Sequence, residues 1–122
     1  MASPTNQPAP YCPERGDIIW LDFDPILGNE QAKQRPAFVV TKRAFNALYH
    51  LCLACPITST NRGDPFDVVL PATLQIANSV GGVVRSHHLR SMSWEKRGSQ
   101  FIVRAPNLTI ADVLAKIKTL AS

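Results

Sequence analysis

Two residues near the C-terminal third of the chain have the types and spacing that phosphate chemistry requires. Arg85 and His87 lie two positions apart, so an extended strand places both on one face, with Ser86 and His88 on the other. Histidine exchanges protons near neutral pH, and a guanidinium stabilises the negative charge that builds up on a reacting phosphate. This segment therefore predicts a site that acts on a phosphate group.

A second candidate segment is the connection at residues 24–36, which is long compared with the usual linker of about two to six residues between adjacent strands. It contains Glu30, which can accept a proton, and Arg35, whose planar fork fits a phosphate. Pro36 restricts the backbone of Arg35 to an extended conformation. Taken alone, the segment is more typical of a solvated hydrophilic turn.

Thiol side chains lie within the strand expected to end at residue 57, and hydroxyl side chains directly follow it. Thr58, Ser59 and Thr60 follow it and could hold a phosphate oxygen, although such clusters are also common in turns. Cys52 and Cys55 have CxxC spacing, but positions i and i+3 of a strand point to opposite faces. We expect both cysteines to pack in the core, and the sequence predicts no metal site.

Composition and charge limit the possible classes of protein. The chain has 122 residues, 45% of them hydrophobic, which is the size of one domain, and it contains no apolar run long enough to cross a membrane. It has three cysteines and begins without a secretory signal pattern, so we expect a cytoplasmic protein.

The net charge is +4, and residues 85–104 alone carry five cations against Glu95, which indicates a surface for a polyanion. The alternative is a merely solvated basic face.

Short apolar segments separated by turn residues predict a barrel or sandwich. Residues 1–14 contain four prolines and are expected to form a flexible arm ahead of a domain at 15–122. The two tryptophans are expected in the core rather than stacked on bases. The expected strands are Gly16–Phe23, Ala37–Lys42, Leu51–Ile57, Phe66–Leu70, Gly82–Ser86, Ser91–Trp94 and Gln100–Arg104.

Two helices are expected among these strands. Residues 43–49 form a short one, and the second begins near residue 109, with Thr109 as its N-cap and Asp112 as capping-box partner. Leu108 and Val113 could pack against each other across this start. The apolar face that should cover the sheet consists of Ile110, Val113, Leu114, Ile117 and Leu120.

Three motifs occur in a fixed order along the chain. They are Gly16-Asp17-Ile18-Ile19-Trp20 leading to Asp24-Pro25, then Gly28-Asn29-Glu30-Gln31 leading to Arg35-Pro36, then Pro56-Ile57-Thr58. In this order and spacing they resemble the MazF/PemK/Kid toxins of bacterial toxin–antitoxin systems. The resemblance extends from about Arg15 to Leu120.

The resemblance implies a fold, an activity and partners. The fold is mainly β, a small SH3-like antiparallel barrel with a C-terminal helix, which forms a homodimer with a groove for single-stranded RNA. The activity is sequence-specific cleavage of messenger RNA without a metal or another cofactor. The ribose 2′-hydroxyl attacks the phosphorus and leaves a 2′,3′-cyclic phosphate and a 5′-hydroxyl. A cognate antitoxin with an acidic, flexible tail would neutralise the toxin.

The resemblance also assigns roles to residues. Arg35 matches an arginine assigned to proton transfer and phosphate stabilisation, and Thr58 matches a residue that hydrogen-bonds the scissile phosphate. Glu30 matches a loop glutamate, and Arg85 matches an arginine that some members use. Where those members have aspartate, this chain has His87, so Glu30 or His87 would act as base. Candidate RNA contacts are Asn29, Gln31, Lys33, Ser59, His88 and Arg90.

Two other functions remain open at this point. A gyrase inhibitor similar to CcdB would share the fold but lack the nuclease residues. It would also act through an aromatic C-terminal end, whereas this chain ends in Thr119-Leu120-Ala121-Ser122. A non-catalytic SH3-like module that binds RNA or peptide would use the basic segment equally well.

Overall fold

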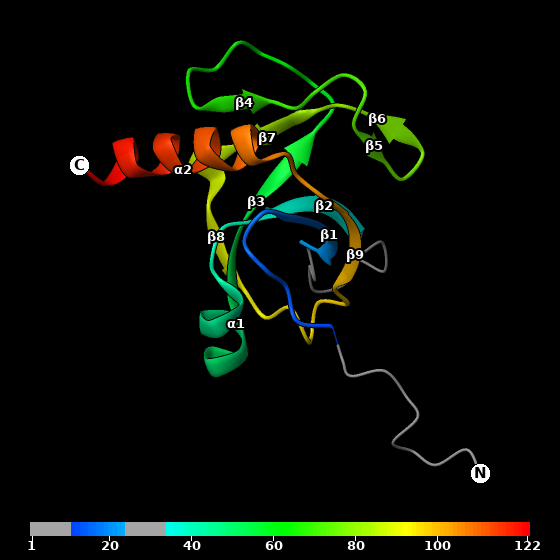
Figure 1. Cartoon of the computed structure of the whole chain (residues 1–122), viewed down its shortest axis with the longest axis vertical. Helices are drawn as coiled ribbons and strands as arrows, with labels where there is room; N and C mark the ends of the chain where they lie inside the picture. Colours follow the sequence, from blue (N-terminus) through cyan, green and yellow to red (C-terminus); the bar gives the residue numbers. More distant parts are fainter. Residues whose placement is uncertain (1–10, 24–33) are drawn as a thin grey trace, which may run out of the picture.

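The computed structural model describes residues 11–23 and 34–122. Nine short strands and two α-helices make up this part of the chain (Figure 1). In chain order they are β1 (Asp17–Asp22), β2 (Gln34–Val39), α1 (Arg43–Tyr49), β3 (Cys52–Thr58), β4 (Asp67–Val69), β5 (Gln75–Ile76), β6 (Ser79–Val80), β7 (Val83–Arg85), β8 (Arg90–Met92), β9 (Gln100–Arg104) and α2 (Asn107–Ala121). A 3₁₀ helix, Ser86–His88, separates β7 from β8.

All strand pairs are antiparallel, and the main sheet has the order β4-β7-β3-β2-β1-β9, with β8 beside β3. The pair β5–β6 forms a separate hairpin. Within the described residues β4, β8 and β9 each pair with a single strand of this sheet, so the barrel is open rather than closed. The expected mainly β fold with a C-terminal helix is confirmed.

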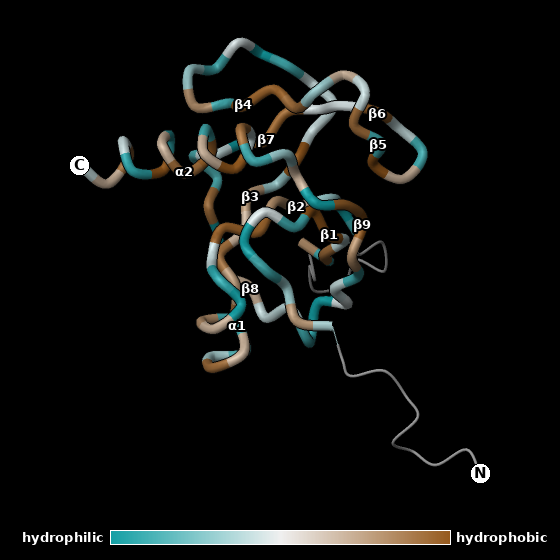
Figure 2. The backbone as a smooth tube through the Cα atoms, in the orientation of Figure 1, coloured by the Kyte–Doolittle hydropathy of each residue, from teal (hydrophilic) through white to brown (hydrophobic). Residues whose placement is uncertain are grey.

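Residues on the two faces of β1, β2 and β3 pack into two hydrophobic clusters. The first cluster contains Phe38, Cys55 and Val113 and lies between the sheet and α2. The second, on the opposite face, contains Ala37 and Cys52. Figure 2 shows hydrophobic residues along β4 and β7, and Figure 1 shows α2 beside these strands. Sheet and helix thus share the first cluster.

Both cysteines of the CxxC spacing pack as expected, on opposite sides of the sheet. Each is completely buried, and burial raises the pKa of both thiols to about 12. The two thiols are therefore packing groups rather than nucleophiles or metal ligands.

Helix α2 begins three residues earlier than the capping pattern predicts. Its N-cap is Pro106, without a side-chain cap hydrogen bond, and Thr109 is buried inside the first turn. The expected contact of Leu108 is wrong, because that side chain is 82% exposed. The proposed apolar face is confirmed except at Leu120, which is 45% exposed. Among the described residues no helix is both long and apolar enough to span a membrane.

The bounds of some strands also differ from those expected from the sequence. Helix α1 and strand β9 have the expected bounds, but β2 begins at Gln34 instead of Ala37. Pro36 lies inside this strand because pairing with β3 begins one residue later, so its missing N–H breaks no bond of that ladder. The β5–β6 hairpin was not expected. Short two-residue strands give almost no periodic signal.

Residues 11–14, assigned to a flexible arm from the sequence, pack against the barrel. Pro13 is fully buried, and the Tyr11 hydroxyl donates to Asp17 Oδ2 at 2.5 Å. Burial, together with this bond, raises the pKa of Tyr11. The rest of the expected arm, residues 1–10, lies outside the described residues.

Gly16, directly before β1, provides a test of how tightly α2 packs. Its φ is +91°, and an added Cβ would collide with Ile110 of α2. Gly16→Ala should lower the free energy of unfolding by about 3 kcal/mol, from the left-handed backbone and from overpacking together. Gly63, with φ of +71° and nothing within 4 Å of an added Cβ, is the matched control. Gly63→Ala should cost about 1 kcal/mol. Urea unfolding measures both, and equal losses would contradict close packing at Gly16.

Candidate active site

The register of β2 and β3 brings two of the expected catalytic residues onto one face. Ala37 lies opposite Pro56 in the ladder. Continuing this register by two residues puts Arg35 opposite Thr58. Residues two apart on a strand share a face, so both side chains lie on the face of the second hydrophobic cluster, away from α2. Arg35 is an exposed strand residue, paired with Leu21 of β1, and not the loop residue expected from the sequence.

The hydroxyl of Thr58 is oriented by its own turn. The N–H of Thr60 donates to Thr58 Oγ1 at 3.2 Å. This bond uses a lone pair of the oxygen and leaves the O–H free to donate. Thr58 is partly exposed and Ser59 is exposed, so both can be reached from solvent. A phosphate oxygen would be a suitable acceptor for this O–H.

Arg85 reaches the same face from the neighbouring strand. Val83 of β7 lies opposite Thr58, and alternation places Arg85 on the same side as Val83. Across the next ladder Arg85 lies opposite Asp67 of β4. Arg85 Nε is 3.0 Å from Asp67 Oδ1, an ion pair in which the side chains are 16% and 2% exposed. The buried carboxylate holds this guanidinium in place.

His87 meets Arg85, although not in the way the sequence predicts. The extended strand expected through Ser86 ends at Arg85, and His87 lies in the 3₁₀ helix. The turn still brings His87 Nε2 to 3.4 Å from Arg85 Nη2 and 3.5 Å from Asp64 Oδ2. The expected alternation of faces along residues 85–88 is therefore wrong, while the expected proximity of arginine and histidine is confirmed.

The remaining candidate residues differ in how far the structure describes them. Arg90 is exposed on β8, with its guanidinium carbon 5.6 Å from the centre of the Phe23 ring. His88 contacts His87, with ring centres 4.4 Å apart. Partial burial, together with His87 and Arg85, lowers the pKa of His88. Four candidates lie outside the described residues: Asn29, Glu30, Gln31 and Lys33.

A groove of about 310 Å³ runs beside Thr58 and adds residues that the sequence did not indicate. Its walls include Trp20, Ser59 and Asn78, the last from the turn of the β5–β6 hairpin. Trp94 is buried, and its indole donates to the Asn46 carbonyl at 3.1 Å, so its core position is confirmed. Trp20 is instead only partly buried and faces this groove.

Three potential metal ligands also meet at this site. Asp64, Asp67 and His87 have ligand atoms within 4.8 Å of one another. Arg85 already lies among them and supplies a positive charge next to both Asp67 and His87. A cation in this position opposes the binding of a second one. We therefore assign the cluster to the orientation of Arg85 and His87.

Comparison with known proteins identifies the family. A family model described as the PemK-like, MazF-like toxin of type II toxin-antitoxin systems matches residues 14–121. The chain belongs to this family. The endoribonuclease toxin MazF of Escherichia coli (strain K12) is 39% identical to it over 89 residues, which cover 73% of this chain and 76% of the relative.

Solved structures of the MazF type have the same fold. MazF (Form-I) from Deinococcus radiodurans superimposes with a TM-score of 0.80 and 40% identity, covering 92% of this chain and 98% of that chain. The MazF-like chain is similarly close to a MazE-MazF structure (Form-III) from that organism, with a TM-score of 0.80, 39% identity and coverage of 91% and 97%.

The buried pair of Asp67 and Arg85 yields a prediction for this toxin fold. Asp67→Asn leaves the guanidinium without its counter-charge and should lower the free energy of unfolding by about 3 kcal/mol. Asp64, whose side chain is 32% exposed, is the matched control, and Asp64→Asn should cost less than about 1 kcal/mol. Urea unfolding measures both variants. The double variant Asp67→Asn/Arg85→Gln should recover part of the loss, and no recovery would contradict a coupled pair.

Proposed function

We propose that this protein is the toxin of a type II toxin–antitoxin system and acts as a sequence-specific endoribonuclease on single-stranded messenger RNA. Its family and the name endoribonuclease of its MazF relative support this function. The observation that carries it is the strand register, from which we infer that Arg35, Thr58 and Arg85 share one sheet face. An exposed arginine and a hydroxyl on neighbouring strands can hold one phosphodiester between them.

The proposed reaction needs no group beyond the RNA and the protein. The ribose 2′-oxygen attacks the adjacent phosphorus, its proton passes to a base, and the bond from phosphorus to the 5′-oxygen breaks. The leaving 5′-oxygen takes up a proton, so the products are a 2′,3′-cyclic phosphate and a 5′-hydroxyl. DNA lacks the 2′-hydroxyl and is not a substrate.

Each residue of the face has a proposed role in this reaction. Arg35 donates to the non-bridging oxygens and supplies positive charge as negative charge builds up on the phosphate. The Thr58 O–H donates a further hydrogen bond to the same group. Arg85, fixed by Asp67, adds positive charge, and Glu30 or His87 accepts the proton of the 2′-hydroxyl.

The partners follow from the same surface. We propose a cognate antitoxin of the MazE type, whose acidic, flexible tail competes with RNA for the basic face, since both are polyanions. Complexes of MazE with MazF from Deinococcus radiodurans support this assignment. We further propose a homodimer that acts in the cytoplasm, where messenger RNA is available.

Replacement of Arg35 or Thr58 tests the function. Arg35→Ala and Thr58→Ala should each slow RNA cleavage by about 10²-fold or more, because each removes a group that stabilises the reacting phosphate. Circular dichroism should show an unchanged fold, since Arg35 is exposed and Thr58 partly so. Lys118→Ala, an exposed change on α2, is the control and should leave cleavage intact.

The same assay separates the three candidate functions. Wild-type protein incubated with RNA in EDTA should cut it, and sequencing of the new 5′ ends should reveal a consensus. Binding without cutting would instead support a non-catalytic module, and neither would support a protein target such as gyrase. Full activity of both alanine variants would refute the site assignment.

The salt dependence of RNA binding tests the contribution of Arg90. With RNA that carries 2′-O-methyl groups, and so cannot be cut, the association constant should fall steeply with salt. Arg90→Gln should reduce the slope of log association constant against log salt by about 0.7, the value for one phosphate contact with a single strand. Lys118→Gln should leave the slope unchanged. A slope near zero in wild type would contradict dominant phosphate contacts.

A further inference from the structure

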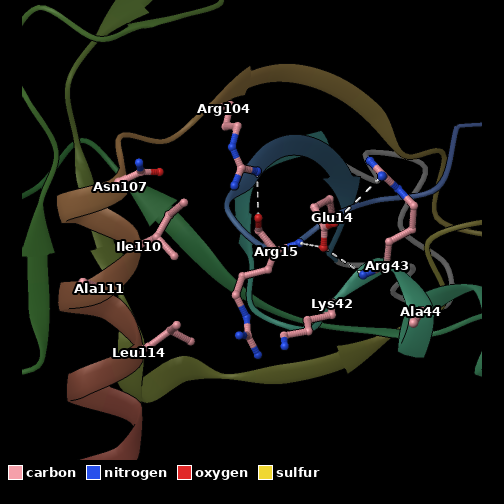
Figure 3. Close-up of a pocket in the computed structure, with 10 residues that line it drawn as sticks. All are labelled: Glu14, Arg15, Lys42, Arg43, Ala44, Arg104, Asn107, Ile110, Ala111 and Leu114. Carbon is pink, nitrogen blue, oxygen red and sulfur yellow. Dashed lines mark hydrogen bonds and ion pairs between the residues drawn. The ribbon is translucent and has the colours of Figure 1, made fainter.

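A second basic site lies away from the Arg35 and Thr58 face. A cavity of about 600 Å³ opens where the chain enters β1, where α1 begins, and where β9 leads into α2 (Figure 3). Four of its lining residues are cations: Arg15, Lys42, Arg43 and Arg104. Lys42 follows the far end of β2 from Arg35, which is seven residues and about 20 Å along extended chain. The cavity is therefore separate from the proposed cleavage site.

Backbone carbonyls hold three of these cations in position. Arg15 Nε donates to the Val40 carbonyl at 2.7 Å, and Arg104 Nη1 donates to the Arg15 carbonyl at 2.8 Å. Arg43 Nε donates to the Cys12 carbonyl at 3.2 Å. A carbonyl orients a guanidinium without neutralising it, and each arginine keeps further N–H groups for a ligand. The cations are thus pre-arranged, which lowers the entropy cost of binding.

Negative charge around the cavity is small and already engaged. Glu14 is the single carboxylate among the described lining residues. Its Oε1 accepts the backbone N–H groups of Arg15 at 2.8 Å and Arg43 at 2.9 Å, and its Oε2 lies 3.8 Å from Arg43 Nη1. These bonds, that from Arg43 first, lower the pKa of Glu14. Asp17, which is 3.4 Å from Arg104 Nη1, is buried behind the cavity.

Helix α2 adds to the positive potential. Its first residue, Asn107, lines the cavity, its N-cap Pro106 forms no side-chain cap, and its first turn contains no acidic residue. The positive end of the helix dipole is therefore not compensated locally. Ile110 and Leu114 of the same helix form an apolar wall on which the carbon part of a ligand can rest (Figure 3).

We propose that this cavity is a second anion site, which binds a phosphate group. Several guanidinium forks around one volume, together with an uncapped helix start, match the multiple acceptors and double charge of phosphate better than a single carboxylate. The phosphate belongs either to a free phosphate compound or to a nucleic-acid backbone that extends beyond the cleavage site. Neither source requires RNA cleavage by the protein.

Titrations followed by amide NMR spectra test this site. The probes are inorganic phosphate and a short single-stranded DNA, which carries backbone phosphates but cannot be cut. Each titration is compared with sodium chloride at equal ionic strength. Amide shifts should concentrate at residues 14–15, 42–44, 104 and 107. Lys42→Gln, which removes an exposed charge at the rim, should weaken binding about tenfold, as expected for a charge-assisted hydrogen bond.

The outcomes distinguish the two sources and can overturn the proposal. Shifts with phosphate alone identify a small phosphate compound, and shifts with DNA alone identify a nucleic-acid backbone. Lys118→Gln removes an exposed lysine at the other end of α2 and should leave both titrations unchanged. No shift at these amides with either probe, or an equal effect of Lys42→Gln and Lys118→Gln, would refute the site whether or not the protein cleaves RNA.

Discussion

The register between β2 and β3 is the constraint on which the proposed active site depends. Arg35 and Thr58 are far apart in sequence, and they share a face because Ala37 lies opposite Pro56. A slip of one residue would turn Arg35 toward the cluster beneath α2, where an unpaired charge would be costly. Burial on both faces prevents such a slip, since Phe38 packs under α2 while Ala37 packs on the other side. The hydrophobic pattern of the sheet therefore positions the polar pair at its end.

A second constraint holds the later strand. Arg85 lies on the same face as Thr58, and the nearly inaccessible Asp67 on β4 fixes its guanidinium. A buried ion pair contributes little net stability, because the cost of desolvating both charges offsets their attraction. Its effect here is geometric: the guanidinium cannot rotate away without leaving a buried carboxylate unpaired. The register between β2 and β3 thus positions Arg35, and the ion pair with Asp67 fixes Arg85.

The sequence predicts the architecture better than the details of the site. Short apolar segments between turn residues predicted the mainly β fold and the bounds of β9, because apolar patterning reflects burial directly. The helix expected at residues 43–49 also has its expected bounds. The expected start of β2 was wrong at Pro36. A proline disrupts a strand only where its missing N–H would have bonded to a neighbouring strand, and β3 is not yet paired with β2 at that residue. The expected start of α2 was wrong because Thr109 is a buried residue of the first turn and not the N-cap, and the sequence alone does not distinguish these two positions.

Contacts between segments far apart in the chain could not be predicted from the sequence alone. Motif order pointed to Arg35, Thr58 and Arg85, but no local pattern shows that Asp67 faces Arg85 across a ladder. In retrospect, the aspartate in the short apolar segment 66–70 was a signal, because a charge within a buried strand requires a partner. The basic cavity at Arg15 and Arg104 combines residues 89 positions apart and had no such signal.

The geometry around His87 bears on the choice of base that the sequence left open. Its Nε2 already lies between a cation and an anion, 3.4 Å from Arg85 Nη2 and 3.5 Å from Asp64 Oδ2. Its Nδ1 is buried without a hydrogen-bond partner among the described residues. A general base must present a free nitrogen to the 2′-hydroxyl, and neither nitrogen of His87 does so in this arrangement. The contacts of His87 therefore favour a role in linking Asp64 to Arg85 over a role as the base.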